Sequence, residues 1–271
     1  MPGSEGLSAL GGGSPTEAAP SPVRPWVIGA GLCLALSLPA LAQGTDWRAA
    51  APDLALDGPV REMRAPVMLG GSAWGPWRRI CREQGLNPGR PPRRDCLAVA
   101  EARVEGDAVR LTLVQEGTSL RIAARRDTEG RVTEFAAARA DGSDPPPDAA
   151  RDGLLAAWRD QFATLSLTRR RIAPGEGFAL PVEGSPQGMA CRPEGTGAVA
   201  GRSVLVARCA VELAGRLRGG AAEARVAIFA RVAVDVPTGM VVAQGYATRI
   251  ETFAGGRSNG VVVTPSRVLV E

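Results

Sequence analysis

The residues that first suggest chemistry lie in the string DVPTG, which begins at Asp235. The string is similar to a catalytic aspartate motif, in which Thr-Gly follows the aspartate directly, but here two residues intervene. Pro237 presets φ for a turn position, and Gly239 tolerates a positive φ. The sequence therefore predicts a tight turn between strands at 224–235 and 240–253, with no catalytic role for Asp235.

Composition excludes most other catalytic sites. The chain has no histidine and no lysine, which rules out Ser-His-Asp triads, Cys-His and Ser-Lys dyads, Schiff-base lysines and histidine-ligated metals. Paired carboxylates remain, and such pairs cleave glycosidic bonds when suitably spaced. The candidate pairs are Asp235 with Glu251 and Glu176 with Glu183. We expect no catalytic residues, no metal site and no cofactor, and keep a carboxylate-dependent hydrolase of envelope glycans as the alternative.

The N-terminal region has the layout of an export signal. Residues 1–22 are rich in Gly, Ser and Pro and are interpreted as a disordered leader or a misannotated start. Residues 23–42 form the expected signal peptide, with Arg24 before an apolar run at 26–38 and cleavage after Ala42. That run is shorter than the roughly 20 residues that span a bilayer. We therefore expect a periplasmic or secreted protein that does not span the membrane after cleavage.

The cysteines agree with export. Beyond the predicted cleavage site the chain keeps Cys81, Cys96, Cys191 and Cys209. An even number in an exported protein predicts two disulfides, and three connectivities are possible. We favour Cys81–Cys96 and Cys191–Cys209, because each would close a short loop and contribute about 3 kcal/mol. A zinc site is disfavoured, since neither a CxxC spacing nor a histidine is present.

Every basic side chain is an arginine, and several occur in pairs, at Arg78-Arg79, Arg93-Arg94 and Arg125-Arg126. Such pairs could bind phosphates or anionic polymers. Acidic residues are interspersed, so we interpret the arginines as a solvated surface. Aromatic residues make up only 4% of the chain, too few to stack bases, and we expect no nucleic-acid partner.

Hydrophobic periodicity predicts a mainly β fold of the α+β kind, with an antiparallel curved sheet or half-barrel. An extended lead-in at 43–69 precedes a first β half at 70–144, where apolar and polar residues alternate. A linker and helix at 145–166 follow, and a second β half occupies 167–271.

The single main helix is expected to be amphipathic. Asp148 is placed to cap its N-terminus, after a proline run that no strand would accept. Leu154, Leu155, Trp158 and Phe162 recur at helical spacing. Acidic and basic residues mix on its polar side, so we expect this apolar stripe to contact the sheet rather than a membrane surface.

The two β halves carry a weak internal repeat. A cysteine pair is followed in each by an Asp-to-Gly turn, at Asp127 and at Asp235, which suggests two similar halves. The last strand, at 261–270, contains Pro265. Because proline cannot complete a ladder on both sides, we expect this strand at an edge of the sheet.

The string VDVPTGMVV, together with the signal peptide, the cysteines and the strand pattern, resembles uncharacterised exported β-rich envelope proteins of Gram-negative bacteria. The resemblance covers mainly residues 191–253. At the level of fold it is similar to the half-barrels of periplasmic lipoprotein carriers. That similarity implies a curved sheet that wraps a helix and holds acyl chains.

We therefore expect a non-catalytic, envelope-associated protein that binds an apolar or lipid-like ligand, with a lipid or another envelope component as its partner. The candidate ligand residues are Val226, Ile228, Val232 and Val234, which alternate along one strand and would face the concave side of the sheet. The alternative is that all four simply pack beneath the helix.

Overall fold

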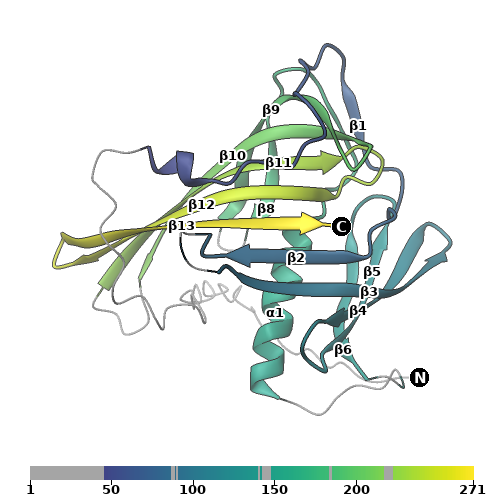
Figure 1. Ribbon diagram of the computed structural model, residues 1–271, viewed down its shortest axis with the longest axis horizontal. Helices are drawn as coiled ribbons and strands as arrows, with labels where there is room; N and C mark the ends of the chain where they lie inside the picture. The colour runs from purple at the N-terminus through teal and green to yellow at the C-terminus, as the bar shows by residue number, and fades with distance from the viewer. Residues whose placement is uncertain are drawn as a thin grey trace, which may run out of the picture.

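Alternating apolar and polar residues give this chain long antiparallel strands, most of which join one sheet (Figure 1). The computed structural model describes residues 46–86, 89, 91–139, 141, 148–182, 185–216 and 222–271. The predicted signal peptide lies outside these residues. The elements are η1 (Trp47–Ala50), β1 (Val67–Leu69), β2 (Arg79–Gln84), β3 (Arg93–Glu105), β4 (Ala108–Gln115), β5 (Arg121–Asp127), β6 (Val132–Ala138), α1 (Ala149–Thr164), β7 (Arg170–Ile172), β8 (Phe178–Val182), β9 (Ser185–Val199), β10 (Arg202–Arg216), β11 (Ala222–Asp235), β12 (Val241–Ala254) and β13 (Arg257–Val270).

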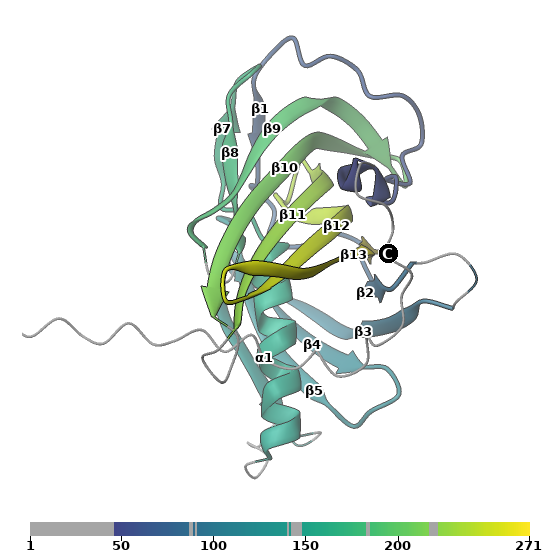
Figure 2. The same ribbon diagram turned by 90° about the vertical axis from the view of Figure 1, so that its left-hand side faces the viewer.

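The main sheet has eleven strands in the order β6-β5-β4-β3-β2-β13-β12-β11-β10-β9-β8, and β1 pairs with β7 in a second, two-stranded sheet. Two consecutive meanders, β2 to β6 and β8 to β13, are joined where β13 pairs with β2. All pairings are antiparallel. The sheet is strongly curved and open, with β6 and β8 as its edges (Figure 2). The predicted mainly β, antiparallel, curved fold with one helix is confirmed.

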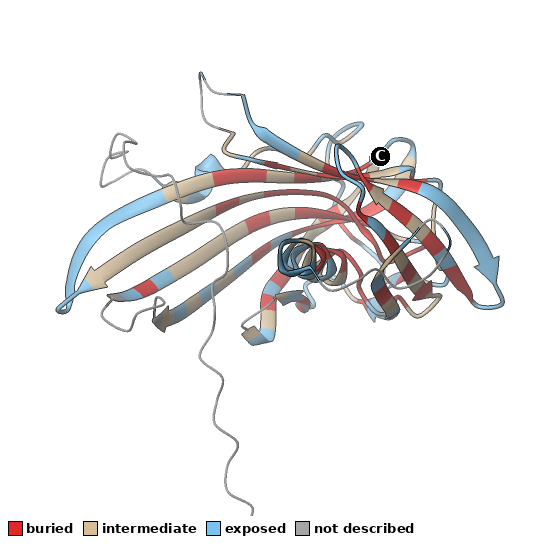
Figure 3. Ribbon diagram, turned by 90° about the horizontal axis from the view of Figure 1, so that it is seen from below, coloured by how far each residue is buried: buried red, intermediate tan, exposed pale blue. Residues whose placement is uncertain are grey.

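Helix α1 lies on the concave side of the sheet, where it contacts the two edge strands, β6 and β8 (Figures 2 and 3). Asp148 caps the helix as predicted, because its carboxylate accepts hydrogen bonds from the backbone N–H groups of Ala150 and Arg151. Trp158 and Phe162 are buried beneath the sheet. The helix thus fills part of the mouth of an open half-barrel.

Strand register divides the sheet into an inner face, toward α1, and an outer face. Val234 and Leu205 are opposite each other on β11 and β10, and both are fully buried. Phe135 on β6 packs against Phe162 of α1, with ring centroids 5.4 Å apart. These apolar residues belong to one continuous core, which lies between the helix and the inner face.

Both predicted disulfides are present with the favoured connectivity. Cys81–Cys96 joins β2 to β3, and Cys191–Cys209 joins β9 to β10; in each, the two cysteines are directly opposite in the ladder. Because disulfides persist in oxidising compartments, the pair indicates a non-cytoplasmic protein.

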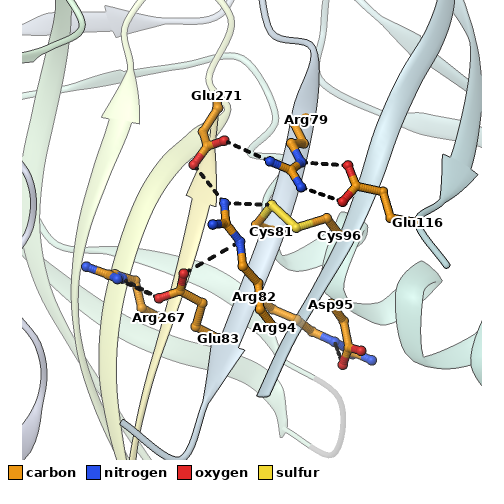
Figure 4. The surroundings of a disulfide bond; sticks show 10 residues. All are labelled: Arg79, Cys81, Arg82, Glu83, Arg94, Asp95, Cys96, Glu116, Arg267 and Glu271. Atoms are coloured by element: carbon orange, nitrogen blue, oxygen red, sulfur yellow. Dashed lines mark hydrogen bonds and ion pairs between the residues drawn. A yellow bond between two sulfur atoms is a disulfide. The ribbon is translucent and has the colours of Figure 1, made fainter. Parts of the chain in front are cut away.

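Ion pairs surround Cys81–Cys96 on the outer face (Figure 4). Arg94 donates to the sulfur of Cys81 over 3.4 Å and to a carboxylate oxygen of Glu271 over 3.2 Å. The network links β2, β3, β13 and the β4–β5 turn through Arg79–Glu116, Arg79–Glu271, Arg94–Glu83, Arg94–Glu271 and Arg267–Glu83. Three arginines and three glutamates balance, so these six side chains carry no net charge.

The prediction that the last strand lies at an edge is wrong. β13 lies between β12 and β2, near the middle of the sheet. Pairing with β2 begins only at Ser266, one residue after Pro265. The carbonyl of Pro265 accepts from the N–H of Leu86, and a residue's N–H and C=O point to the same side of an antiparallel strand. The missing N–H therefore faces a side on which β2 has already ended.

The internal repeat does not mark equivalent positions. Asp127 ends β5, the second strand after the one that carries Cys96. Asp235 ends β11, the strand directly after the one that carries Cys209.

The segment predicted as an extended lead-in crosses the outer face of β12 at Gly245. A Cβ added to Gly245 would lie 1.9 Å from the carbonyl oxygen of Pro52, so only glycine fits there.

Candidate functional site

The four residues predicted to bind a ligand all lie on the inner face of β11, but the structure separates them into two pairs. Val232 and Val234 are both 0% exposed and belong to the core, so their assignment to an open ligand surface was wrong. The reason is that the core extends to this end of β11. Val226 and Ile228 are partly exposed, farther along the same strand, and they remain candidates.

Val226 and Ile228 belong to a wider apolar surface, which we name the open face. It consists of two rows of inner-face residues that are opposite one another across β10, β11, β12 and β13. All of them are partly or largely exposed, and Val262 is 38% exposed. The open face comprises Val211, Leu213, Val226, Ile228, Thr248, Ile250, Val262 and Thr264.

The open face exists because β10 to β13 are long, with 14 or 15 residues each, whereas the elements beneath them are short. Seen from below, these strands extend beyond α1, and their burial falls from red to tan and blue along their length (Figure 3). Helix α1 contacts the sheet edges at β6 and β8 rather than this region. Within the described residues, the inner face therefore changes from core to partly exposed apolar surface.

On β12 and β13, the side chains between the open face and the core are polar, and we call Tyr246 and Ser266 the polar band. On β10 and β11 the same row consists of the buried residues Cys209 and Ala230. Tyr246 is next inward from Thr248 on β12, and its hydroxyl bonds to Ser266 on β13. Burial raises the pKa of Tyr246, although the hydrogen bond to Ser266 and the charge of Arg82 oppose that shift. Arg82 on β2 lies beside this band, opposite Val268.

The raised pKa of Tyr246 predicts a measurable titration. Tyr246 is the only tyrosine in the chain, so tyrosinate absorbance near 295 nm reports it alone. We expect a midpoint above 10 in the folded protein and near 10 in urea, where burial is lost. Because the folded pKa is the higher one, this group's contribution to stability declines as pH rises above 10. A folded midpoint at or below 10 would contradict the desolvation of the Tyr246 phenol.

Arg82 and Trp158 form the inner wall beside the polar band. The Arg82 guanidinium carbon lies 4.5 Å from the centroid of the Trp158 ring, within the range of a cation–π contact. Its Nε lies 3.5 Å from a carboxylate oxygen of Asp95, which also pairs with Arg93 over 3.2 Å. The ring N–H of Trp158 and the Nε–H of Arg82 are buried and have no hydrogen-bond partner in the described part of the chain.

Of the two candidate carboxylate pairs, the structure describes both members only of Asp235 with Glu251, and it places these two far apart. Asp235 is fully buried, and Glu251 lies opposite Arg225, ten residues away along β11, or roughly 33 Å. The carboxylate of Glu176 accepts a hydrogen bond from the backbone N–H of Ala173, and its proposed partner Glu183 lies outside the described residues. Among the described residues, no cluster of three potential ligands suits a metal ion.

Asp235 has the structural role that the sequence predicted. Both of its oxygens pair with Arg202, at 2.7 and 3.0 Å, and one also accepts from the N–H and hydroxyl of Thr238. Gly239 follows with a φ of 66°. The predicted turn between two strands is confirmed, and it joins β11 to β12.

The structure shows a buried residue that sequence reasoning missed. Arg126 is 0% exposed and donates to the Ser166 hydroxyl and to the carbonyls of Ala73 and Thr238. The prediction that the arginine pairs lie on a solvated surface is therefore wrong for Arg126. Its period-2 spacing from Ile122 already placed it on the apolar face of β5, and that signal could have identified it.

Two hollows lie away from the open face. One of about 770 Å³ is on the outer face, where Arg208 and Arg231 both pair with Glu194. Another, of about 730 Å³, lies between the N-terminal part of α1 and the ends of β4 to β6, and includes Leu120 and Leu154.

Neither a protein-family model nor a curated protein matches this sequence. The function must therefore be inferred from the geometry. In the part of the chain that the structure describes, no helix combines the length and apolarity needed to cross a bilayer.

Proposed function

We propose that this chain is a non-catalytic, envelope-associated protein, periplasmic or secreted, that binds an apolar, lipid-like ligand on the open face. The observation that carries the proposal is the exposure of Val226, Ile228, Ile250 and Val262 on the concave side of the sheet. The two disulfides support an extracytoplasmic location.

The physical basis is the apolar area of this surface. Four strands spaced by ~4.8 Å make the open face about 14 Å wide. Covering apolar surface gains roughly 25 cal/mol per Å², and each buried CH₂ contributes about 0.8 kcal/mol. β-branched side chains hold their rotamers, so little conformational entropy is lost when a chain settles on them. An alkyl chain laid on this surface thus gains hydrophobic free energy without any rearrangement of the sheet.

No observation favours the alternative of a glycan hydrolase. Its candidate Asp235 is enclosed by Arg202 and Thr238, with no exposed oxygen for a substrate. Its candidate partner Glu251 pairs with Arg249 at the other end of the sheet.

The neutral fluorescent probe 1-N-phenylnaphthylamine tests the proposal, because its emission rises in an apolar site. We expect saturable binding to the native protein. Val262→Gln is expected to weaken that binding by about five- to tenfold, because a polar side chain replaces apolar contact area.

Val261→Gln is the matched control. Val261 is the neighbouring residue on β13, is 43% exposed, and points to the outer face. It should leave probe binding unchanged. Equal weakening by both substitutions would place the probe elsewhere, and the absence of saturable binding would refute the proposal.

A further inference from the structure

We propose that the hollow on the outer face is a second binding site, in which Arg192 and Arg208 bind the phosphate of an organic phosphate monoester while the apolar part of that ligand lies on Phe229. This site and the open face lie on opposite faces of the sheet. The inference therefore does not depend on the proposed function.

The first argument is a row of like charges. Arg192 on β9, Arg208 on β10 and Arg231 on β11 occupy directly opposite positions on three adjacent strands. Neighbouring strands are about 4.8 Å apart, and like charges directly opposite each other destabilise a sheet. An anion bound over this row relieves the repulsion among the three guanidinium groups.

The acidic side chains beside the row neutralise it only in part. Glu194 pairs with Arg208 and with Arg231, whose Nη2 donates to it over 2.8 Å. Asp53 lies 3.6 Å from Arg231, but its side chain is 96% exposed, so solvent screens its charge. Three arginines against Glu194 leave two positive charges. A phosphate monoester carries nearly two negative charges at pH 7, so its charge matches this excess better than that of a carboxylate.

The two arginines that we assign to the phosphate have unused donors. Arg208 pairs with Glu194 through Nε and with no other described residue, and its side chain is 65% exposed. Arg192 is exposed and has no ion-pair partner within the described ranges. Two neighbouring guanidinium groups thus present N–H donors to the hollow. Such forks bind phosphate oxygens in a bidentate manner.

The hollow also provides a place for the apolar part of the ligand. Its volume is about 770 Å³, and Val60 of the lead-in, which passes over Gly195, forms part of its wall. Beside the arginine row, the residues on the outer face are Ala190, Ala210 and Phe229, again directly opposite one another. The Phe229 ring is partly exposed, since alanines are small neighbours. A planar group that lies on it is about 7 Å from the arginine row.

Isothermal titration calorimetry with phenyl phosphate, benzoate and phenol tests the inference, because the three ligands share one ring and differ in charge. At pH 7 we expect phenyl phosphate to bind about tenfold more tightly than benzoate, and phenol to bind most weakly. Inorganic phosphate should bind about fivefold more weakly than phenyl phosphate, because it lacks the ring contact. Phenyl phosphate that binds no more tightly than benzoate or phenol would overturn the inference.

Substitutions at both ends of the hollow locate the ligand. Arg192→Gln removes no ion pair among the described residues, so the urea midpoint should stay unchanged while phenyl phosphate binds about tenfold more weakly. Arg192→Lys keeps the charge and should restore part of the affinity. Phe229→Ala should bring phenyl phosphate to the affinity of inorganic phosphate. Binding of phenyl phosphate that is unchanged by Arg192→Gln would contradict the assignment.

Arg225→Gln is the matched control. Arg225 is an exposed arginine on the same face of β11, six residues or about 20 Å from Arg231, and lies over the ring of Phe253. It should leave phenyl phosphate binding unchanged. A loss equal to that of Arg192→Gln would mean that net charge alone attracts the ligand, and would overturn the inference.

The two proposed sites can be tested separately. Val262→Gln should leave phenyl phosphate binding unchanged, and Arg192→Gln should leave binding of 1-N-phenylnaphthylamine unchanged. Loss of probe binding in the native protein refutes the open face alone, and loss of phosphate binding refutes the hollow alone.

Phosphatidic acid carries the same phosphate monoester on a lipid, so vesicles distinguish the source of the ligand. The protein is sedimented with phosphatidylcholine vesicles that contain or lack phosphatidic acid. Sedimentation that requires phosphatidic acid and is reversed by phenyl phosphate supports a lipid ligand. Binding of phenyl phosphate without sedimentation supports a soluble ester, and binding of neither overturns the inference.

Discussion

Replacing Asp235 with alanine is expected to lower the free energy of unfolding by about 3–4 kcal/mol. The side chain is fully buried, and its removal leaves Arg202 without its two hydrogen bonds. The N–H and hydroxyl of Thr238 lose their acceptor as well. Urea unfolding followed by circular dichroism measures this difference.

The cost is high because the β11–β12 turn is bonded to several other segments. The carbonyls of Val236 and Pro237 accept from the N–H groups of Gly70 and Ser72, and the carbonyl of Gly239 accepts from Leu167. A Cβ on Gly239 would lie 3.0 Å from the carbonyl oxygen of Leu167, so these backbones are in close contact. A distorted turn therefore disturbs the loop before β2 and the segment after α1 together.

Asp127 provides the matched control for this prediction. It ends β5 as Asp235 ends β11, but its partner, Arg131, is 65% exposed. Burial raises the pKa of Asp127, and the hydrogen bonds and charge of Arg131 outweigh that effect and hold the pKa below its ordinary value. Asp127→Ala should cost only about 1 kcal/mol. A loss for Asp235→Ala no larger than that for Asp127→Ala would contradict the role of the buried network.

The local elements of this fold could be predicted because their physical causes are local. Alternation of period 2 gave the strands, Asp148 gave the start of the helix, and Pro237 with Gly239 gave the turn. The connectivity of the two disulfides was predicted because each cysteine pair closes a short loop between neighbouring strands. Each of these features depends on residues within about twenty positions of one another, for example 15 and 18 for the two disulfides.

The arrangement of the strands could not be predicted in the same way. Val268 pairs with Arg82, 268 − 82 = 186 positions earlier, and nothing in either strand specifies that partner. The error about Pro265 arose here, since a proline next to the end of a shorter neighbour is tolerated in a central strand.

The candidate site was predicted only in part for the same reason. Alternation correctly placed Val226, Ile228, Val232 and Val234 on one face of β11. Which of them is covered depends on where α1 and the turns end, and these positions result from tertiary packing. The neighbourhood of Arg82 and the polar band was not anticipated, because β2, which carries Arg82, is far in sequence from β12 and β13, which carry Tyr246 and Ser266.

Replacing Arg126 with alanine is expected to lower the free energy of unfolding by about 4 kcal/mol, and Arg126→Met by about 2–3 kcal/mol. Both leave the carbonyls of Ala73 and Thr238 and the hydroxyl of Ser166 without their donor. Alanine adds a cavity in a fully buried position, whereas methionine fills most of that volume. Chemical denaturation of the two variants at pH 7 measures both losses.

Arg125→Ala is the control, because Arg125 is the adjacent residue, 39% exposed, and paired with Glu105 at 3.8 Å on the outer face. It should cost less than about 1 kcal/mol.

Burial lowers the pKa of Arg126 to about 10, while the charges of Asp127 and Asp235 oppose that shift. The folded pKa is thus below that of the unfolded chain, so above about pH 10 the unfolded state binds the proton more tightly. Across that window the stability of the native protein should rise relative to Arg126→Met. A difference that stays constant or falls above pH 10 would mean that the cation is hydrated in the folded protein, and the turn cluster would then not be the dry, fully bonded interior that its geometry implies.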